Sequence, residues 1–392
     1  MSFDNMVSRS ETDSIKWEVG DQDRDVSGRE IIAMGLADME FRAPQSVLEA
    51  LMVRVEHGIF GYTGVSDEFK LSVVDWMARR KGWRVESEWL VVSSGAMPAI
   101  NLLIQQLTSR GDGIIIQPPV FGPIPESVVN NGRTVMNSPL RLSAGRYEMD
   151  FDDLEDKASD PRSKMFLLCS PHNPVGRVWS RSELNRVADI CVNHDLVLVS
   201  DEIHGDLVHP DHVFTSMGVV DRPPSKLVVC ISASKTFNLP GLKTSITIVP
   251  DEDLRESLWL GMRNLNDTFS VNALGILATQ TAFDQGEPWL AELLDYLAAN
   301  LALVSSVFEV RLPQIRVIRP EATFLVWLDC RELGLDSSAL AELIRREAGV
   351  VVEPGSIYGP EGEGFVRINI GCPRSVLEDA LERMRAVLAE LG

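Results

Sequence analysis

The residue with the clearest chemical potential is Lys235, which follows the apolar run 227–232 and is flanked by small hydroxylic residues. We expect its side chain to lie in a partly desolvated pocket, where burial lowers the pKa of the ammonium group towards the nucleophilic free amine. Such an amine can bond covalently to a reactive carbonyl. An isolated lysine at a strand end is more often an ordinary surface charge, so Lys235 indicates a catalytic site only together with partners.

Asp201 is the second candidate, because it ends the apolar run 196–200, where an unpaired carboxylate would be expensive to bury. It therefore requires a cation, and a protonated pyridine nitrogen could supply one through a hydrogen bond worth about 1.5–3 kcal/mol. The alternative is a helix N-cap ahead of Glu202. Asn173, between two prolines, could offer a fixed amide donor, although Asn-Pro alone is more often just a turn.

The elements that position these residues follow from seven short, nearly all-apolar runs that alternate with amphipathic stretches. This pattern predicts an α/β fold with a mainly parallel seven-stranded sheet, buried by helices on both faces. The predicted strands are 89–92, 113–117, 133–135, 165–169, 196–200, 227–232 and 245–249, and the predicted helices between them are 96–107, 182–193 and 254–263.

Polar segments stand at the carboxyl ends of these predicted strands, where ligands bind in sheets of this kind. Segments 170–176, 200–206 and 232–243 each follow a strand. A fourth segment, 93–97, joins the first strand to a helix whose free N–H groups suit a phosphate. We therefore expect the ligand site at this edge of the sheet.

We expect three parts along the chain: an N-terminal arm over residues 1–45 that contributes to a small domain, a large domain over 46–284, and a C-terminal small α+β domain over 285–392. The spacing of apolar residues predicts the elements of these parts. Further helices are predicted at 44–55, 68–81, 289–308, 337–348 and 376–391, and further strands at 324–328, 350–352 and 365–370.

Composition excludes several classes of function. The chain has 57 acidic and 37 basic residues and a formal charge of −20, which disfavours binding to nucleic acid or to an anionic membrane. Its five scattered cysteines suit neither a disulfide framework nor a zinc site, and its histidines show no spacing typical of metal ligands. With no secretion signal or long apolar run, we expect a cytoplasmic protein without a metal.

Together these segments resemble the fold-type I pyridoxal phosphate enzymes, the aspartate aminotransferase superfamily (class I/II), in order over most of the chain. The resemblance implies that Lys235 bonds covalently to pyridoxal 5′-phosphate, Asp201 pairs with its pyridine nitrogen, and Asn173 donates to its phenolic oxygen. Family sites are completed across a two-fold interface, so it also implies a homodimer with shared active sites. The implied phosphate ligands are Gly95, Ala96, Ser232, Ser234, Lys243 and, from the neighbouring subunit, Tyr62.

Five stretches, 37–41, 55–63, 170–179, 201–207 and 234–239, look like the cystathionine β-lyase-like carbon–sulfur lyases. The resemblance implies β-elimination of an S-substituted L-cysteine, an amino acid substrate, to a thiol, pyruvate and ammonia. Lys235 would remove the α-proton as general base. Arg367 matches the arginine that binds the substrate carboxylate, although a lone arginine in a strand is more often a structural ion pair.

His204, in the lyase-like stretch 201–207, stands where transaminases commonly carry a tyrosine, although it could equally be an ordinary strand-end histidine. Two other sites depart from the expected pattern. Phe121 replaces the tyrosine that stacks on the cofactor ring, which keeps the stacking and removes a hydroxyl. Gly35 and Leu36 stand where the lyases usually have a tryptophan, which suggests a roomier substrate pocket for a bulky S-conjugate.

Alternative reactions remain open at this point. The same lysine, aspartate and arginine would serve a class I/II aminotransferase, which needs a 2-oxoacid for turnover. A variant enzyme could decarboxylate or oxidatively deaminate a cysteine S-conjugate in specialised metabolism. A cofactor-binding regulatory protein is the third alternative, although no helix-turn-helix segment accompanies the domain.

Overall fold

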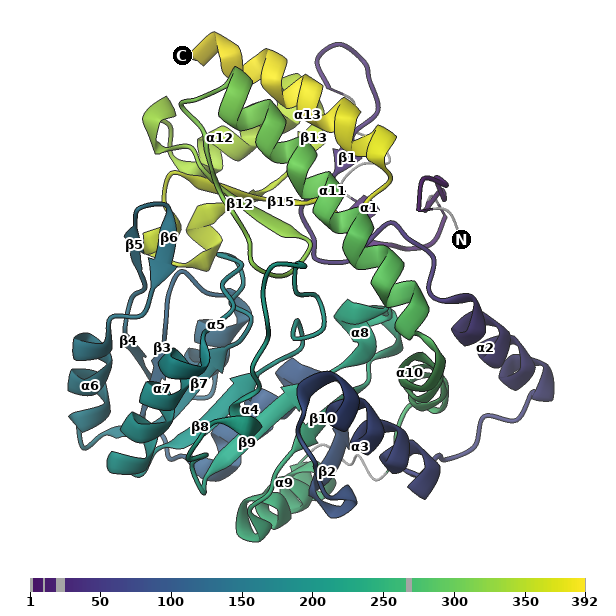
Figure 1. Ribbon diagram of the computed structural model, residues 1–392, viewed down its shortest axis with the longest axis vertical. Helices are drawn as coiled ribbons and strands as arrows, with labels where there is room; N and C mark the ends of the chain where they lie inside the picture. Colours follow the sequence, from purple (N-terminus) through teal and green to yellow (C-terminus); the bar gives the residue numbers. More distant parts are fainter. Residues whose placement is uncertain (1–2, 10, 19–24, 266–269, 392) are drawn as a thin grey trace.

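The computed structural model describes residues 3–9, 11–18, 25–265 and 270–391. Figure 1 shows a larger unit built around a sheet in the lower half of the view and a smaller unit near the C-terminus in the upper half. This arrangement confirms the predicted α/β fold with a smaller α+β unit. The domain boundaries at residues 45 and 284 stay a prediction.

The larger unit is built on a seven-stranded sheet. Its strands are β2 (Leu90–Ser93), β3 (Gly113–Ile116), β4 (Thr134–Asn137), β7 (Ser163–Cys169), β8 (Val197–Asp201), β9 (Leu227–Ile231) and β10 (Ser245–Ile248). They lie in the order β2-β10-β9-β8-β7-β3-β4, and only β10 runs antiparallel to its neighbours. The predicted mainly parallel sheet is confirmed, since each predicted apolar run overlaps one of these strands.

Helices cover both faces of this sheet, because alternate strand residues are apolar on each side. Ile114 and Ile116 pack into one core and Ile115 into the other. The first core includes residues of α4 (Ala96–Leu107), α5 (Pro123–Asn130) and α9 (Glu252–Leu265). The second includes residues of α2 (Gln45–His57), α3 (Asp67–Lys81), α6 (Phe151–Ser159), α7 (Arg181–Asn193) and α10 (Ala273–Gln285).

The smaller unit carries a four-stranded antiparallel sheet. In spatial order its strands are β11 (Arg316–Ile318), β12 (Leu325–Asp329), β15 (Phe365–Asn369) and β14 (Glu353–Pro354). Its helices are α11 (Glu287–Arg311), α12 (Ser337–Leu343) and α13 (Arg374–Leu388). The arm reaches this unit through β1 (Ile32–Ala33), which pairs in parallel with β13 (Val350–Val351).

Some elements differ from those predicted. The predicted helix 337–348 is α-helical only to Leu343 and continues as a π-helical turn, Ile344–Ala348. The helices α5, α6 and α10 were not predicted from the sequence. Several short elements were also not predicted, because two to four residues are too few to show a periodicity. They are α1 (Ile15–Glu18), β5 (Arg141–Ser143), β6 (Arg146–Glu148), α8 (Ala233–Thr236) and the 3-10 turns Ser87–Trp89, Met217–Val219, Pro240–Leu242, Arg331–Leu333, Gly355–Tyr358, Pro360–Gly362 and Ala389–Leu391.

The helix α11 joins the two units (Figure 1), since it contacts both α10 and α13. Within the described residues it is the one helix whose length and apolar composition would suffice to cross a membrane. Its buried side includes Leu293, Leu297, Val304 and Phe308, which belong to the main core. A core helix has this same composition, because one of its faces must pack against the protein interior.

Candidate active site

The site is built where neighbouring strands of the central sheet end. Asp201, the last residue of β8, pairs with Cys169 at the end of β7 and with Cys230 in β9. Directly after β9, Ser232 caps the short helix α8, which carries Lys235. Parallel strands end at one edge of a sheet, so the fold brings the two principal candidates to the same place.

The amine of Lys235 is partly buried and donates a hydrogen bond to the carbonyl oxygen of Ala37, 2.7 Å away. Burial lowers the pKa of Lys235 to about 8, and the positive charge of Arg367 acts in the same direction. The carboxylates of Asp38 and Asp201 oppose this decrease. A substantial fraction of the lysine is therefore the nucleophilic free amine slightly above neutral pH, as a carbonyl-binding lysine requires.

The carboxylate of Asp201 is buried and poorly compensated. It accepts one hydrogen bond, from the backbone N–H of Ile203 at 3.3 Å, and forms no ion pair with any residue in the described ranges. Burial raises the pKa of Asp201 to about 6, despite the opposing effects of Ile203 and Lys235. Turns follow β8, so Asp201 is not the N-cap of a helix. The site thus offers a buried acceptor for a cationic ligand group.

Arg367 lies buried in the middle of β15. Its guanidinium donates to Oδ1 of Asn173 at 3.1 Å and to the carbonyl of Gly35 at 2.9 Å, and it lies over the ring of Tyr358 at 5.1 Å. Its Nε has no hydrogen-bond partner, and no carboxylate of the described chain is within ion-pair distance. Arg367 is therefore not a structural ion pair here, and its charge is available to a bound anion.

Asn173 and His204 lie in the same cluster. The bond that Asn173 accepts from Arg367 leaves its amide nitrogen as a donor, and its backbone carbonyl accepts from the N–H of Phe121 at 3.1 Å. His204 is buried, and its Nδ1 has no partner in the part of the chain that the structure describes. Burial lowers the pKa of His204 to about 3, with Lys235 and Arg367 contributing. We expect this histidine to be neutral.

The predicted phosphate ligands come from two strand ends that meet. Ser93 at the end of β2 pairs with Ser245 at the start of β10, and their hydroxyls are 2.8 Å apart. Gly95 stands at the N-cap position of α4 with a φ of 142°, a conformation that favours glycine, and Ala96 is the first helical residue. The first N–H groups of this helix have no partner within the helix and are suited to binding an anion.

The other predicted phosphate ligands lie on the loop between β9 and β10. The hydroxyl of Ser232 donates to the carbonyl of Thr244 at 2.7 Å and lies 2.9 Å from the hydroxyl of Ser234. Lys243 directly precedes Thr244, and its charge helps to lower the pKa of Lys235. These contacts bring Ser232, Ser234 and Lys243 into the neighbourhood of the reactive lysine.

Tyr62 does not join this cluster within one chain. It follows α2 on the surface, where 87% of the residue is exposed. A role for Tyr62 in the site therefore depends on a second subunit, and that role stays a proposal.

Two residues beside Arg367 were not predicted from the sequence. Tyr358 is buried with its ring against the guanidinium, and Glu353 lies opposite Arg367 in the neighbouring strand. Tyr358 lies in the Gly- and Pro-rich segment 354–364. This composition is typical of a surface loop, so it did not predict a buried tyrosine. The register of β14 against β15 would have revealed Glu353, but a two-residue strand leaves no periodic signal.

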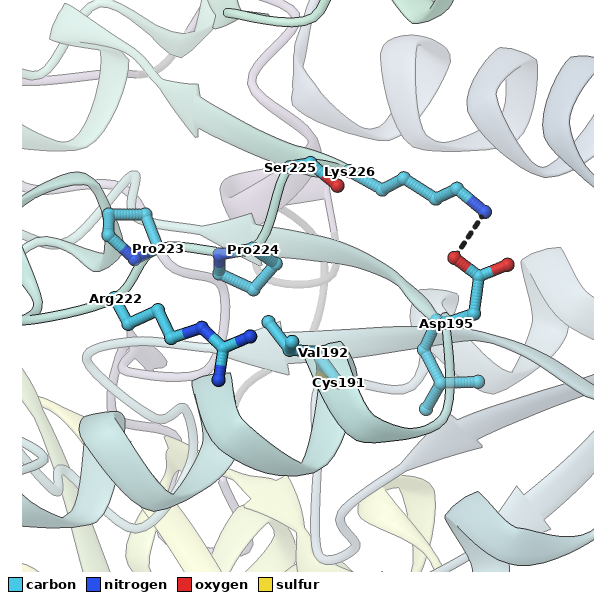
Figure 2. A pocket seen from close by; sticks show the side chains of 9 residues that line it. Cys191, Val192, Asp195, Arg222, Pro223, Pro224, Ser225 and Lys226 are labelled. Atoms are coloured by element: carbon cyan, nitrogen blue, oxygen red, sulfur yellow. Dashed lines mark ion pairs between the residues drawn. The ribbon is translucent and has the colours of Figure 1, made fainter.

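A separate hollow of about 240 Å³ lies between the end of α7 and the loop that leads into β9 (Figure 2). It is at the opposite edge of the sheet from Lys235, next to the starts of β8 and β9. Its charged groups include Arg222 and the Lys226–Asp195 ion pair at 2.7 Å. Burial raises the pKa of Cys191, so this thiol is not a nucleophile. We assign no chemistry to this hollow.

Comparison with known proteins places the chain in a family. Residues 29–384 match the family "Aminotransferase class I and II", to which the chain belongs. It is 39% identical to cystathionine beta-lyase PatB of Bacillus subtilis, over 99% of this chain and 100% of that protein. Protein MalY of Escherichia coli is 33% identical over 96% of each chain. The predicted class I/II resemblance is confirmed.

Solved structures agree with this assignment. Cystalysin from Treponema denticola, which contains a pyridoxal 5′-phosphate cofactor, superposes with a TM-score of 0.94 at 34% identity, covering 100% of this chain and 99% of that one. The PLP-bound C-S lyase from Staphylococcus hominis gives a TM-score of 0.90 at 32% identity with the same coverage.

The residues of the site fit pyridoxal 5′-phosphate. Asp201 is a buried carboxylate in need of a cation, which a protonated pyridine nitrogen would supply. Lys235 offers an amine with a lowered pKa to the aldehyde. The start of α4 would offer N–H groups, and Lys243 a positive charge, to the phosphate.

Proposed function

We propose that the protein is a pyridoxal phosphate-dependent carbon–sulfur lyase that cleaves an S-substituted L-cysteine to a thiol, pyruvate and ammonia. The observation that carries this proposal is the convergence of three incompletely paired charged groups: Asp201 and Lys235, at or just after the ends of β8 and β9, and Arg367, from the middle of β15. The names of the curated relatives support elimination over amino transfer.

Each residue has a defined task in this proposal. Asp201 holds the proton on the pyridine nitrogen, Asn173 donates to the phenolic oxygen, and the α4 start with Ser232, Ser234 and Lys243 binds the phosphate. When bound, pyridoxal phosphate accepts the electron pair that the α-carbon retains after losing its proton. Phe121 stacks on the ring.

The remaining residues bind the substrate and move protons. Arg367 binds the α-carboxylate bidentately, since its charge has no other anion. Nζ of Lys235 removes the proton from Cα as general base. The resulting ammonium of Lys235 can then protonate the sulfur that leaves Cβ, a task that Phe121 cannot perform because it lacks a hydroxyl.

We also propose that two chains share their active sites in a homodimer. The segment that ends in Tyr62 carries exposed apolar side chains, each more than half exposed, which an isolated chain would leave in water. They are Met52, Val53, Val55, Ile59 and Phe60. Burial of this segment against a partner would bring Tyr62 towards the partner's phosphate site. A cytoplasmic location is part of the same proposal.

Product analysis tests the function. We expect the purified protein, loaded with pyridoxal phosphate, to release equal amounts of thiol and pyruvate from S-substituted L-cysteines without an added 2-oxoacid. The roomier pocket suggested by Gly35 stays a prediction, because Glu353 lies against this glycine; faster turnover of a bulky S-glycosyl cysteine than of cystathionine would support it. A requirement for a 2-oxoacid would instead identify an aminotransferase, and release of carbon dioxide or an aldehyde would identify the decarboxylating or deaminating variant.

Substitution of Arg367 should affect substrate binding in particular. Arg367→Lys retains the charge and loses the bidentate geometry, so we expect KM to rise by about 10- to 100-fold with a smaller change in kcat. Steady-state kinetics measure this split. The matched control is Arg331→Lys, which alters an arginine paired with Asp329 at the surface. An unchanged KM in Arg367→Lys would remove Arg367 from the substrate site.

A further inference from the structure

The substrate-binding arginine has a carboxylate as its cross-strand neighbour. In the register of β14 with β15, Glu353 is the partner of Arg367. Residues directly opposite each other in an antiparallel pair project from the same face of the sheet, with Cα atoms about 4.5–5.5 Å apart. Glu353 therefore stands on the face of the sheet from which Arg367 reaches into the active site.

The carboxylate of Glu353 lies against Gly35. A Cβ atom placed on Gly35 would be 3.1 Å from Oε1 of Glu353, so the carboxylate fills the space that a side chain at position 35 would enter. The carbonyl of the same glycine accepts the 2.9 Å hydrogen bond from Arg367. Gly35 thus touches both the positive and the negative side chain, and the extra room expected at this glycine is partly filled by a charge.

Glu353 is partly buried and has no internal partner. No hydrogen bond or ion pair joins its carboxylate to another residue in the described ranges, and Arg367 instead uses Asn173 and Gly35. Burial raises the pKa of Tyr358, and the charge of Glu353 adds to this rise while Arg367 opposes it. The Glu353 carboxylate is therefore close enough to the Tyr358 hydroxyl to affect it electrostatically, as the Arg367 guanidinium does.

We propose that Glu353 determines specificity by binding a positively charged group on the S-substituent, so that the preferred substrates are cysteine conjugates with an ammonium group beyond the sulfur. This assignment rests on the proposed β-elimination and names its substrate class. An amino acid held by Arg367 places its own carboxylate next to Glu353. Glu353 would repel an anionic S-substituent and would stay unpaired beside an apolar one. An ammonium group would form an ion pair with the carboxylate.

Three conjugates of similar length test this assignment: S-(2-aminoethyl)-L-cysteine, neutral S-propyl-L-cysteine and anionic S-(2-carboxyethyl)-L-cysteine. We expect kcat/KM for the aminoethyl compound to exceed that for the propyl compound by about tenfold, mainly through KM. In Glu353→Gln, which keeps the shape and removes the charge, this ratio should fall to near one. In Glu353→Lys the preference should turn towards the carboxyethyl compound.

The control is Glu332→Gln, which neutralises a surface carboxylate paired with Arg316 in the same unit and should retain the wild-type ratio. Pyruvate from the three conjugates at equal kcat/KM, or an unchanged ratio in Glu353→Gln, would overturn the role of Glu353 and leave β-elimination standing. Absence of pyruvate from every conjugate would overturn β-elimination and this assignment with it.

Discussion

Replacement of Lys235 by alanine is expected to lower pyruvate release by at least about 10³-fold, because one side chain supplies both the covalent link and the proton transfer. The variant should also lose the visible absorbance that the cofactor acquires on bonding to the protein. The amine of Lys235 has one hydrogen bond, to the carbonyl of Ala37, so its loss leaves the fold intact. Turnover and absorbance spectra measure the two effects.

The matched control for this prediction is Lys226→Ala. Lys226 pairs with Asp195 at the far edge of the sheet, so its loss removes a lysine without touching the site. It should retain both the spectrum and the turnover of the wild type. A Lys235→Ala protein that still eliminates thiol at a wild-type rate would show that this amine takes no part in the chemistry.

Asp201→Asn should change activity and stability in opposite directions. In the loaded enzyme we expect kcat to fall by about 10²- to 10³-fold, because the charge that holds the pyridine proton is gone. In the cofactor-free protein we expect a gain in stability. Burial raises the pKa of Asp201 from 3.8 to about 6, so its ionisation at neutral pH opposes folding by an amount on the order of 3 kcal/mol.

The pH dependence follows from the sign of this shift. Between the unfolded pKa of 3.8 and the folded value of about 6, the folded protein binds more protons at Asp201, so stability falls as pH rises and the loss is complete above that range. Urea unfolding of the cofactor-free proteins should therefore show a larger advantage of Asp201→Asn at pH 7.5 than at pH 5. Asp195→Asn is the surface control. An Asp201→Asn protein that is less stable at both pH values would contradict the account of an uncompensated buried charge.

The central sheet and its principal site residues were predictable because both have local signals. The strands buried on two faces are nearly all apolar; Asp201 ends one such run, and Lys235 follows closely after another. Once those runs are parallel neighbours, their ends must meet. Lys235, Asp201, Asn173 and Arg367 therefore lie close together, whereas Tyr62 does not join them within one chain.

The substrate side of the site was less predictable because it depends on contacts distant in sequence. Gly35 meets Arg367 across 332 positions, and Glu353 reaches the site only through the pairing of a two-residue strand. Neither contact leaves a periodic or compositional trace. Tyr62 differs from the other predicted residues, because the phosphate site that it is proposed to reach belongs to a second chain.

The most direct test of the central claim is borohydride reduction of the protein loaded with pyridoxal phosphate, followed by peptide mass spectrometry. We predict one cofactor adduct per chain, on the peptide that contains Lys235, and none in Lys235→Ala. An unmodified Lys235 peptide, or an adduct on another lysine such as Lys243, would contradict this prediction.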